Sequence, residues 1–151
     1  MYCRARKISF LRYLDLVAPS VALAQGFGRI GCFLAGCCYG MEWSGPCAVT
    51  FTESHYAPNG IPLFPSQLVS SGLDFLHFFL LCFLARRSRE PGRIGAFYLL
   101  FYSAGRFCIE FFRGDLERGQ VGSLSTSQFI SLFTAAVGLG ILFFLGRRRK
   151  V

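Results

Sequence analysis

The sequence predicts an all-α integral membrane protein with about four transmembrane helices, and three observations lead to that prediction. The chain of 151 residues is 53% hydrophobic, contains 18 phenylalanines and has a mean hydropathy of +0.46. This is too apolar for an ordinary water-soluble domain. Four apolar segments each approach the roughly 20 residues that cross a bilayer. Basic residues gather beside these segments rather than spreading over the chain.

The four segments are expected to form a single membrane domain over residues 1–151. The expected spans run over residues 14–35, 67–85, 94–112 and 126–146. No separate cleavable signal peptide is expected, because the first ten residues are basic and polar rather than signal-like.

Three basic clusters predict the orientation of these spans. They are Arg4, Arg6, Lys7 and Arg12; Arg86, Arg87, Arg89 and Arg93; and Arg147, Arg148, Arg149 and Lys150. Cytoplasmic loops are enriched in Lys and Arg, so both termini and the 86–93 turn are expected in the cytoplasm. The same distribution explains the net charge of +8 without a nucleic-acid partner, and none is expected.

Residues 41–65 contain no Lys or Arg and are therefore expected outside the cytoplasm. The stretch CAVTFTE, residues 47–53, has the β-branched alternation of a short strand, and APNG after it has the composition of a turn. The predicted fold thus includes a short extracytoplasmic loop region with a small strand.

The stretch GFGRIG, residues 26–31, matches the glycine pattern of a dinucleotide-binding turn. That pattern needs a helix after the glycines, within a crossover of a dozen or more residues. Only eight residues separate Gly31 from Gly40, and the loop-like EWSGP follows soon after. We therefore reject the dinucleotide interpretation. What remains is Arg29 in an apolar, glycine-rich segment.

A second polar cluster lies in the third apolar segment, with Tyr102, Arg106 and Glu110, followed by Arg113 and Asp115. Ionisable groups at membrane depth are costly and usually face a partner or a polar cavity. Residues four apart share one helix face, so Arg106 and Glu110 can form an ion pair that locks helices together. Alternatively, Arg29 and Arg106 recognise an anionic lipid headgroup in one cavity shared with Tyr102 and Glu110, since guanidinium matches phosphate oxygens.

Four cysteines, Cys32, Cys37, Cys38 and Cys47, lie within sixteen residues. One interpretation is a disulfide from Cys47 to Cys37 or Cys38, in a membrane thiol–disulfide protein. A second is simple packing, which is also expected of Cys82, Cys108 and His77 inside the spans. The spacing matches structural zinc sites poorly, and no metal is expected.

Four stretches in order resemble one family. GRIGCFLAGCCYG (residues 28–40) is similar to its G-R-x-G-N-F-x-N-x-E-x-x-G signature, and YSAGRFCIEFFR (102–113) to its Y-G-x-x-R-F-x-x-E-F-x-R pattern. FPSQL (64–68) and GSLSTSQFIS (122–131) resemble its H-P-S-Q-L-Y-E and Gly-x-Leu-Ser-x-x-Gln elements. From about Asp15 onward, the chain resembles the prolipoprotein diacylglyceryl transferases.

The resemblance implies a polytopic enzyme of the bacterial cytoplasmic (inner) membrane that uses no cofactor. It implies transfer of the diacylglyceryl group from phosphatidylglycerol to the lipobox cysteine thiol of a prolipoprotein. By position, Arg106 and Glu110 take catalytic places. The substrate-binding places fall on Arg29, Gly31, Gly40, Tyr102, Arg113 and Gln67.

Several positions depart from the family pattern. Cys32 stands where the family has Asn, Phe64 replaces a histidine, and neither His55 nor His77 matches a catalytic position. The family is nearly twice as long, so the chain corresponds to its C-terminal half. A non-catalytic phosphatidylglycerol-binding paralogue or fragment is therefore an alternative, and a membrane thiol–disulfide protein is another.

Overall fold

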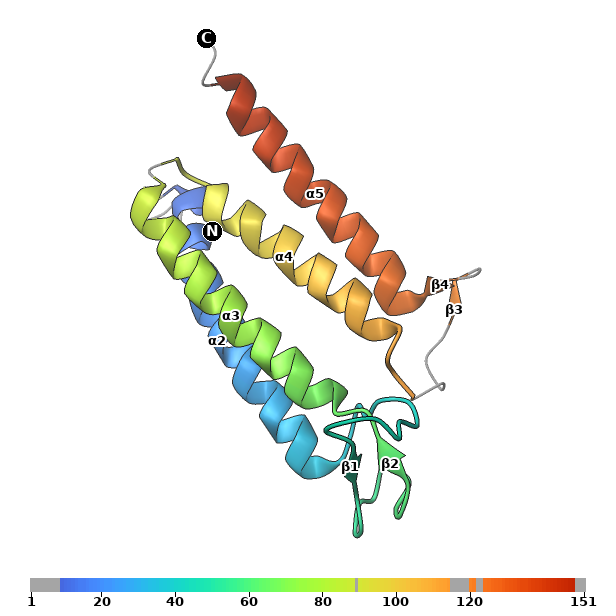
Figure 1. Cartoon of the computed structure of the whole chain (residues 1–151). Coiled ribbons are helices and arrows are strands. Elements are labelled where there is room, and N and C mark those ends of the chain that lie inside the picture. Colours follow the sequence, from blue (N-terminus) through green and yellow to red (C-terminus); the bar gives the residue numbers. More distant parts are fainter. Residues whose placement is uncertain (1–8, 89, 115–119, 122–123, 149–151) are drawn as a thin grey trace.

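The computed structural model describes residues 9–88, 90–114, 120–121 and 124–148. Within these ranges it contains four helices, α2 (Phe10–Ala35), α3 (Ser66–Arg87), α4 (Arg93–Glu110) and α5 (Thr126–Arg148) (Figure 1). Two short antiparallel strand pairs accompany them, β1 (Val49–Thr50) with β2 (Pro62–Leu63), and β3 (Gln120–Val121) with β4 (Leu124–Ser125). The predicted helical fold class with a small strand is confirmed.

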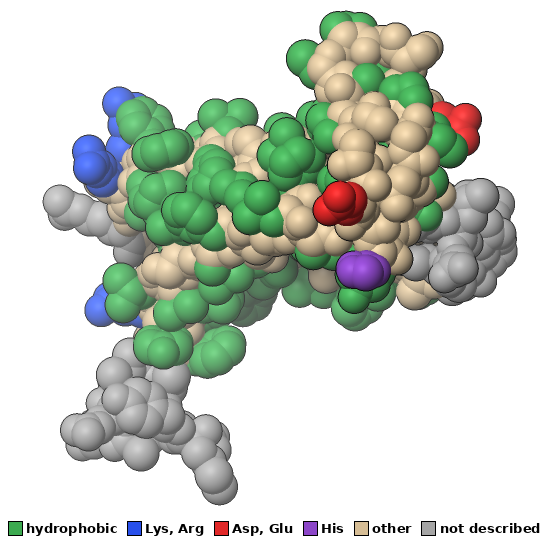
Figure 2. Space-filling model, turned by 90° about the horizontal axis from the view of Figure 1, so that it is seen from below, with side chains coloured by type: hydrophobic (Ala, Val, Ile, Leu, Met, Phe, Trp, Pro, Cys, Tyr) green, Lys and Arg blue, Asp and Glu red, His purple; other side chains and the backbone are tan. Residues whose placement is uncertain are grey.

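Three of these helices, α2, α3 and α5, are long and apolar enough to cross a membrane. Helix α4 has 18 residues and carries Arg93, Arg106 and Glu110. Large apolar side chains point outward over the bundle, and Phe79, Phe133 and Phe143 are each about two-thirds exposed. Hydrophobic side chains are prominent on the face shown in Figure 2. Such a surface suits hydrocarbon, because an exposed apolar area of this extent is costly in water.

The helices pack as two pairs, α2 with α3 and α4 with α5, and α4 lies between α5 and the other pair (Figure 1). Small residues bring α2 close to α3: Ala18, Ala22 and Gly26 are buried along one side of α2. A β-carbon added at Gly26 would lie 2.8 Å from the Phe75 ring of α3. A side chain at position 26 would require the Phe75 ring to shift, so glycine permits the close approach of the two helices.

Helix α4 is joined to α2 by a carboxylate at its N-terminus. Asp15 of α2 accepts hydrogen bonds from the backbone N–H groups of Gly92, at 2.6 Å, and Gly95, at 2.8 Å. These amides lack partners inside α4, and the helix dipole favours negative charge at this end. One side chain thus fixes the register between α2 and α4.

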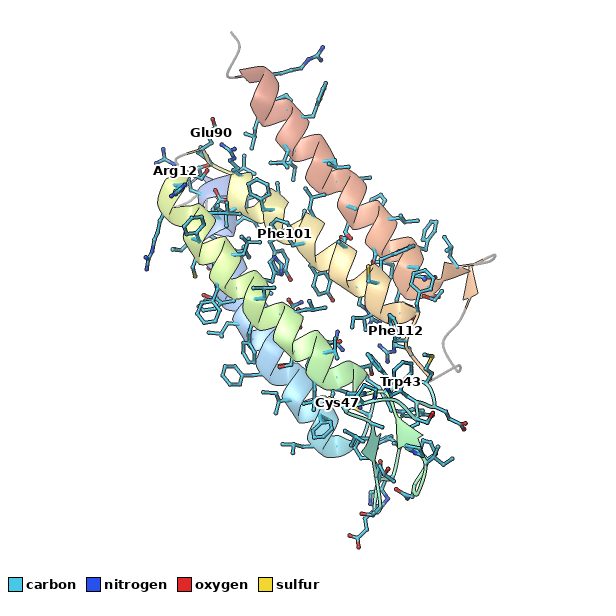
Figure 3. All side chains as sticks on the ribbon, in the orientation of Figure 1. Arg12, Trp43, Cys47, Glu90, Phe101 and Phe112 are labelled. Carbon is cyan, nitrogen blue, oxygen red and sulfur yellow. The ribbon has the colours of Figure 1, made fainter. Side chains whose placement is uncertain are left out.

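The two ends of the bundle differ in composition. The start of α2, the α3–α4 turn and the end of α5 lie at one end, where Arg12 and Glu90 are labelled in Figure 3. The opposite end holds Trp43, Cys47, Phe112 and the β1–β2 pair, in which Val49 is opposite Leu63. Several residues of the predicted charge clusters lie outside the described part of the chain: Arg4, Arg6, Lys7, Arg89, Asp115, Arg149 and Lys150.

Candidate functional site

A cavity of about 40 Å³ lies where the two helix pairs meet. Arg29 of α2, Asp74 and His77 of α3, and Tyr102 and Arg106 of α4 all line it. Phe101, which also lines it, is labelled midway along α4 in Figure 3. Arg29 and Arg106 were predicted to face one cavity with Tyr102 and Glu110. The structure places Arg29, Tyr102 and Arg106 on the cavity, although 73 positions separate Arg29 from Tyr102, whereas Glu110 is not among its lining residues.

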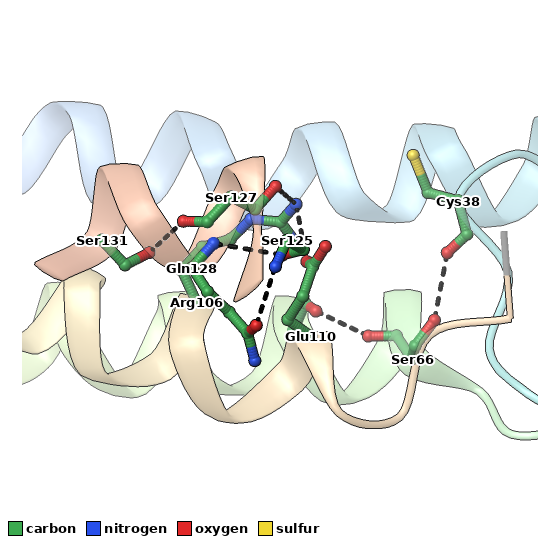
Figure 4. Close-up of polar contacts among 9 residues, drawn as sticks. Cys38, Ser66, Arg106, Glu110, Ser125, Ser127, Gln128 and Ser131 are labelled. Atoms are coloured by element: carbon green, nitrogen blue, oxygen red, sulfur yellow. Dashed lines mark hydrogen bonds and ion pairs between the residues drawn. The ribbon is translucent and has the colours of Figure 1, made fainter. Parts of the chain in front are cut away.

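Arg106 is the best-anchored charge of this site. Its Nη2 lies 3.1 Å from Oε2 of Glu110, and the two side chains are only 12% and 8% exposed. The same nitrogen donates a hydrogen bond of 2.9 Å to Oγ of Ser127 on α5 (Figure 4). The ion pair is thus internal to α4, as the spacing of four residues predicts. The link between helices comes from Ser127, which the sequence analysis did not identify.

Arg29 differs from Arg106 in having no ion pair among the described residues. The site therefore combines one guanidinium held by a carboxylate with one that no acidic partner neutralises at contact distance. The lining thus holds two guanidinium groups and one carboxylate, that of Asp74. Two guanidinium groups that converge on one cavity can bind an anion with several oxygen atoms.

Asp74 and His77 are the site residues that sequence reasoning missed. They are 9% and 7% exposed, and the His77 ring stacks on Tyr98 with centroids 5.3 Å apart. The expected packing role of His77 is confirmed, but the residue also lines the cavity, and its Nε2 has no hydrogen-bond partner in the described part of the chain. The sequence does contain a signal for these two residues: the stretch LDFLH, residues 73–77, places an acid and an imidazole one turn apart in an apolar segment.

The remaining predicted residues do not line this cavity. Gln67 donates a hydrogen bond of 2.9 Å to the carbonyl oxygen of Cys37, and Gly40 pairs with Arg113 in an isolated antiparallel bridge. A β-carbon at Gly40 would meet the backbone oxygens of Phe64 and Phe112, so only glycine fits there. Gly31, in α2, has open space where its β-carbon would lie. Gln67, Gly40 and Arg113 instead join the segments at the loop end of the bundle.

Three cysteines come together at the C-terminal end of α2. The Sγ atoms of Cys32, Cys37 and Cys38 lie within 4.8 Å of one another. Burial, together with the neighbouring thiols of Cys32 and Cys38, raises the pKa of the Cys37 thiol to about 11. Cys47 is exposed, and no disulfide links the six cysteines in the described ranges.

These features define a helical membrane protein with an arginine-lined cavity between two helix pairs. The family model of prolipoprotein diacylglyceryl transferase matches residues 1–144. The phosphatidylglycerol–prolipoprotein diacylglyceryl transferase of Clostridium tetani is 52% identical over 150 residues, which cover 99% of this chain and 59% of that protein. The chain belongs to the prolipoprotein diacylglyceryl transferase family.

Two further relatives give the same result. The phosphatidylglycerol–prolipoprotein diacylglyceryl transferase 2 of Clostridium perfringens is 48% identical over 133 residues, covering 88% of this chain and 52% of that protein. The phosphatidylglycerol–prolipoprotein diacylglyceryl transferase of Streptococcus uberis is 34% identical over 153 residues, covering 99% of this chain and 58% of that protein. The chain spans between half and three-fifths of the length of these relatives.

Proposed function

We propose that this chain transfers the diacylglyceryl group of phosphatidylglycerol to the lipobox cysteine thiol of a prolipoprotein. The observation that carries the proposal is the placement of Arg29 and Arg106, from separate helix pairs, on one cavity. Phosphatidylglycerol has a phosphodiester headgroup, and guanidinium groups bind phosphate oxygens in a fixed, two-pronged geometry. The names of the relatives supply the two substrates.

The reaction needs a cation where the leaving group forms. The acceptor sulfur, as thiolate, attacks the glycerol carbon that carries the phosphate ester. A carbon–sulfur bond forms, the carbon–oxygen bond breaks, and its electron pair stays on the departing glycerol phosphate. The thiol proton passes to a base. Because negative charge grows on the phosphate in the transition state, a fixed Arg106 there lowers the barrier.

Glu110 and Tyr102 have supporting roles in this proposal. Glu110 holds Arg106 at 3.1 Å and so sets the direction of its guanidinium. Tyr102 lines the cavity one turn before Arg106 and offers a hydroxyl to the headgroup. Gly31 lies on α2, and the loop end holds Gln67, Gly40 and Arg113. The proposal assigns these four residues to the approach of the substrates.

The size of the cavity adds a condition to the proposal. About 40 Å³ holds a few water molecules at roughly 10–15 Å³ each, and a lipid headgroup needs more room. Headgroup binding therefore requires the two helix pairs to separate slightly, or Arg106 to leave Glu110. The bond from Arg106 to Ser127 ties this movement to α5.

The proposed location is the bacterial cytoplasmic membrane, with both termini in the cytoplasm and the loop end facing outward. Its support is the gathering of basic residues at the end where α2 begins, α3 turns into α4, and α5 ends. Cytoplasmic ends of spans carry such an excess of Lys and Arg.

The experiment is transfer of labelled diacylglyceryl from phosphatidylglycerol to a lipobox peptide, in mixed micelles, by the purified chain. Arg106→Ala is the test variant, and Arg93→Ala is its matched control, since Arg93 lies on the same helix and outside the cavity. We expect transfer by the chain and by the control, and its loss in Arg106→Ala. Equal transfer by both variants would contradict the assignment of Arg106.

The same experiment separates the alternatives. Phosphatidylglycerol binding without transfer, abolished by Arg106→Ala, would identify a non-catalytic lipid-binding member of the family. Activity that depends on the cysteines and not on Arg29 or Arg106 would identify a thiol–disulfide protein and overturn the proposed function.

A further inference from the structure

The backbone after α2 brings together three thiols that the sequence separates. Helix α2 ends at Ala35, and Gly36 follows in the left-handed conformation, with φ of 70°. Cys38 is also left-handed, at φ 58°, which is costly for a residue with a β-carbon. The N–H of Cys37 donates a hydrogen bond of 3.0 Å to the carbonyl of Cys32. These turns fold Cys37 and Cys38 back over the last turn of α2.

Buried groups on α3 hold this turn in place. Oγ of Ser66 donates to the carbonyl oxygen of Cys38 at 3.0 Å (Figure 4), and Nε2 of Gln67 donates to that of Cys37 at 2.9 Å. Ser66 and Gln67 are each only 2% exposed, so both donors are fixed by packing. The two carbonyls, and with them the two side chains, are positioned before anything binds.

The spacing of the sulfur atoms suits a metal ion. Metal–thiolate bonds are about 2.3 Å long, which places three sulfurs around one ion at roughly 4 Å from each other. The Sγ atoms of Cys32, Cys37 and Cys38 lie within 4.8 Å of one another, so they need to close by less than about 1 Å. All three side chains are half-buried and therefore remain reachable by an ion.

We propose that Cys32, Cys37 and Cys38 form a three-thiolate site for one soft metal ion, with Cu(I) as its occupant. Soft thiolate ligands favour Cu(I), and this ion accepts three sulfurs without a fourth ligand. The described part of the chain places no His, Asp or Glu ligand atom within this group, which makes a four-coordinate zinc site the weaker fit. Binding converts thiols to thiolates and releases their protons to solvent.

The poor match of the C-x₄-C-C spacing to zinc motifs is explained by the same turn. Familiar zinc spacings place two ligands on one short loop. Here one ligand sits in the last helical turn and two follow a left-handed C-cap, so the sulfurs converge only in the folded chain. The site is separate from the arginine-lined cavity, whose lining contains no cysteine. The metal proposal therefore does not depend on the proposed transferase activity.

The test is an anaerobic titration of the reduced chain, in micelles, with Cu(I) in competition with a chromophoric Cu(I) chelator. We expect one Cu(I) per chain and a thiolate-to-copper absorption band in the ultraviolet. Cys32→Ser and Cys37→Ser should each lower the affinity by more than tenfold. Cys47→Ser and Cys82→Ser, the matched controls, should leave it unchanged. Ser66→Ala should weaken binding by about tenfold, because it releases the Cys38 carbonyl from its anchor.

Far-ultraviolet circular dichroism of each variant checks that the helices persist, so that loss of binding is not loss of fold. The proposal is overturned if Cys32→Ser and Cys37→Ser bind like the parent chain, or if Cys47→Ser removes the site. It is also overturned if the fully reduced, folded chain does not compete with the chelator, or if equimolar Zn(II) displaces Cu(I).

Discussion

The two helix pairs of this bundle differ in the number of side-chain hydrogen bonds between their members. Between α2 and α3 the contacts are mostly apolar and close, with Ala18, Ala22 and Leu81 buried and the Gly26 backbone against Phe75. One buried hydrogen bond of 2.9 Å, from Oγ of Ser71 to the carbonyl oxygen of Gly26, joins this pair. Between α4 and α5 hydrogen bonds recur: Ser103 to Thr134 at 2.6 Å, and Arg106 to Ser127 at 2.9 Å. A closely packed interface resists gradual deformation. A single hydrogen bond between helices in lipid, in contrast, contributes little to the free energy that holds the helices together.

The cavity lies at the boundary between these pairs and needs both of them. The α2–α3 pair supplies Arg29, Asp74 and His77, and α4 supplies Tyr102 and Arg106. We therefore expect α2–α3 to be the rigid wall of the site and α4–α5 the adjustable one. Each of the following changes tests one part of that comparison.

The largest effect is expected from removing either arginine. Arg29→Ala and Arg106→Ala should each lower the transfer rate by about 10²–10³-fold, because each removes a fixed charge from the same leaving group. The double variant should be little worse than either single variant, since groups that act as a unit are not additive. Transfer assays beside Arg12→Ala and Arg93→Ala, one control on each helix, measure this. Additive losses would place the two arginines in separate sites.

The next effect concerns the rigid pair. Gly26→Leu should lower the free energy of unfolding by about 1–3 kcal/mol, because its side chain meets the Phe75 ring and forces α2 away from α3. Gly28→Leu is the matched control, since a β-carbon at Gly28 meets no atom within 4 Å. Thermal unfolding in micelles compares them, and similar melting temperatures would refute the close-packed description of this pair.

A smaller loss of unfolding free energy is expected where α2 meets the start of α4. Asp15→Asn keeps one acceptor but removes the charge that caps α4, and should cost about 1 kcal/mol of unfolding free energy. Glu90→Gln, at the same end and in an exposed ion pair with Arg93, should cost much less. Equal effects would mean that the Asp15 cap contributes no more than a surface pair.

Removing a hydrogen bond of the adjustable pair should lower the free energy of unfolding by a still smaller amount. Ser103→Ala and Thr134→Val should each cost about 0.6 kcal/mol, the usual value for one hydrogen bond between helices in a membrane. A double-mutant cycle isolates the bond from other effects of the two substitutions. A coupling energy as large as the Gly26→Leu effect would reverse the comparison between the pairs.

The last change is a titration, that of Cys37, a partly exposed thiol just after α2. Its pKa is raised in the folded chain from an ordinary value near 9 to about 11. The unfolded chain therefore loses this proton first, and the free energy of unfolding should decrease slightly as pH rises from about 9 to about 11. Cys37→Ser should remove that decrease in unfolding experiments on the metal-free chain; its persistence would assign it to another group.

Much of the fold was predictable because lipid imposes simple rules. Apolar runs of about 20 residues must be helices whose backbone groups bond internally, and the four expected segments correspond to α2, α3, α4 and α5. Arg106 and Glu110 were predictable as neighbours for a similarly local reason, since four residues make one helical turn. The membrane crossings and the roles of the site residues remain predictions.

What the sequence by itself determined is thus local: helix, turn, charge pattern, and the family motifs around Arg29 and Arg106. The tertiary structure decided which residues meet. It placed Asp74 and His77 on the same cavity, bonded Arg106 to Ser127, and gathered three thiols that a linear spacing kept apart. The physical reason is that helix formation depends on neighbours within a few positions. Contacts between helices depend instead on the rotation and register of whole elements, set here by Gly26, Asp15 and the left-handed turn at Gly36.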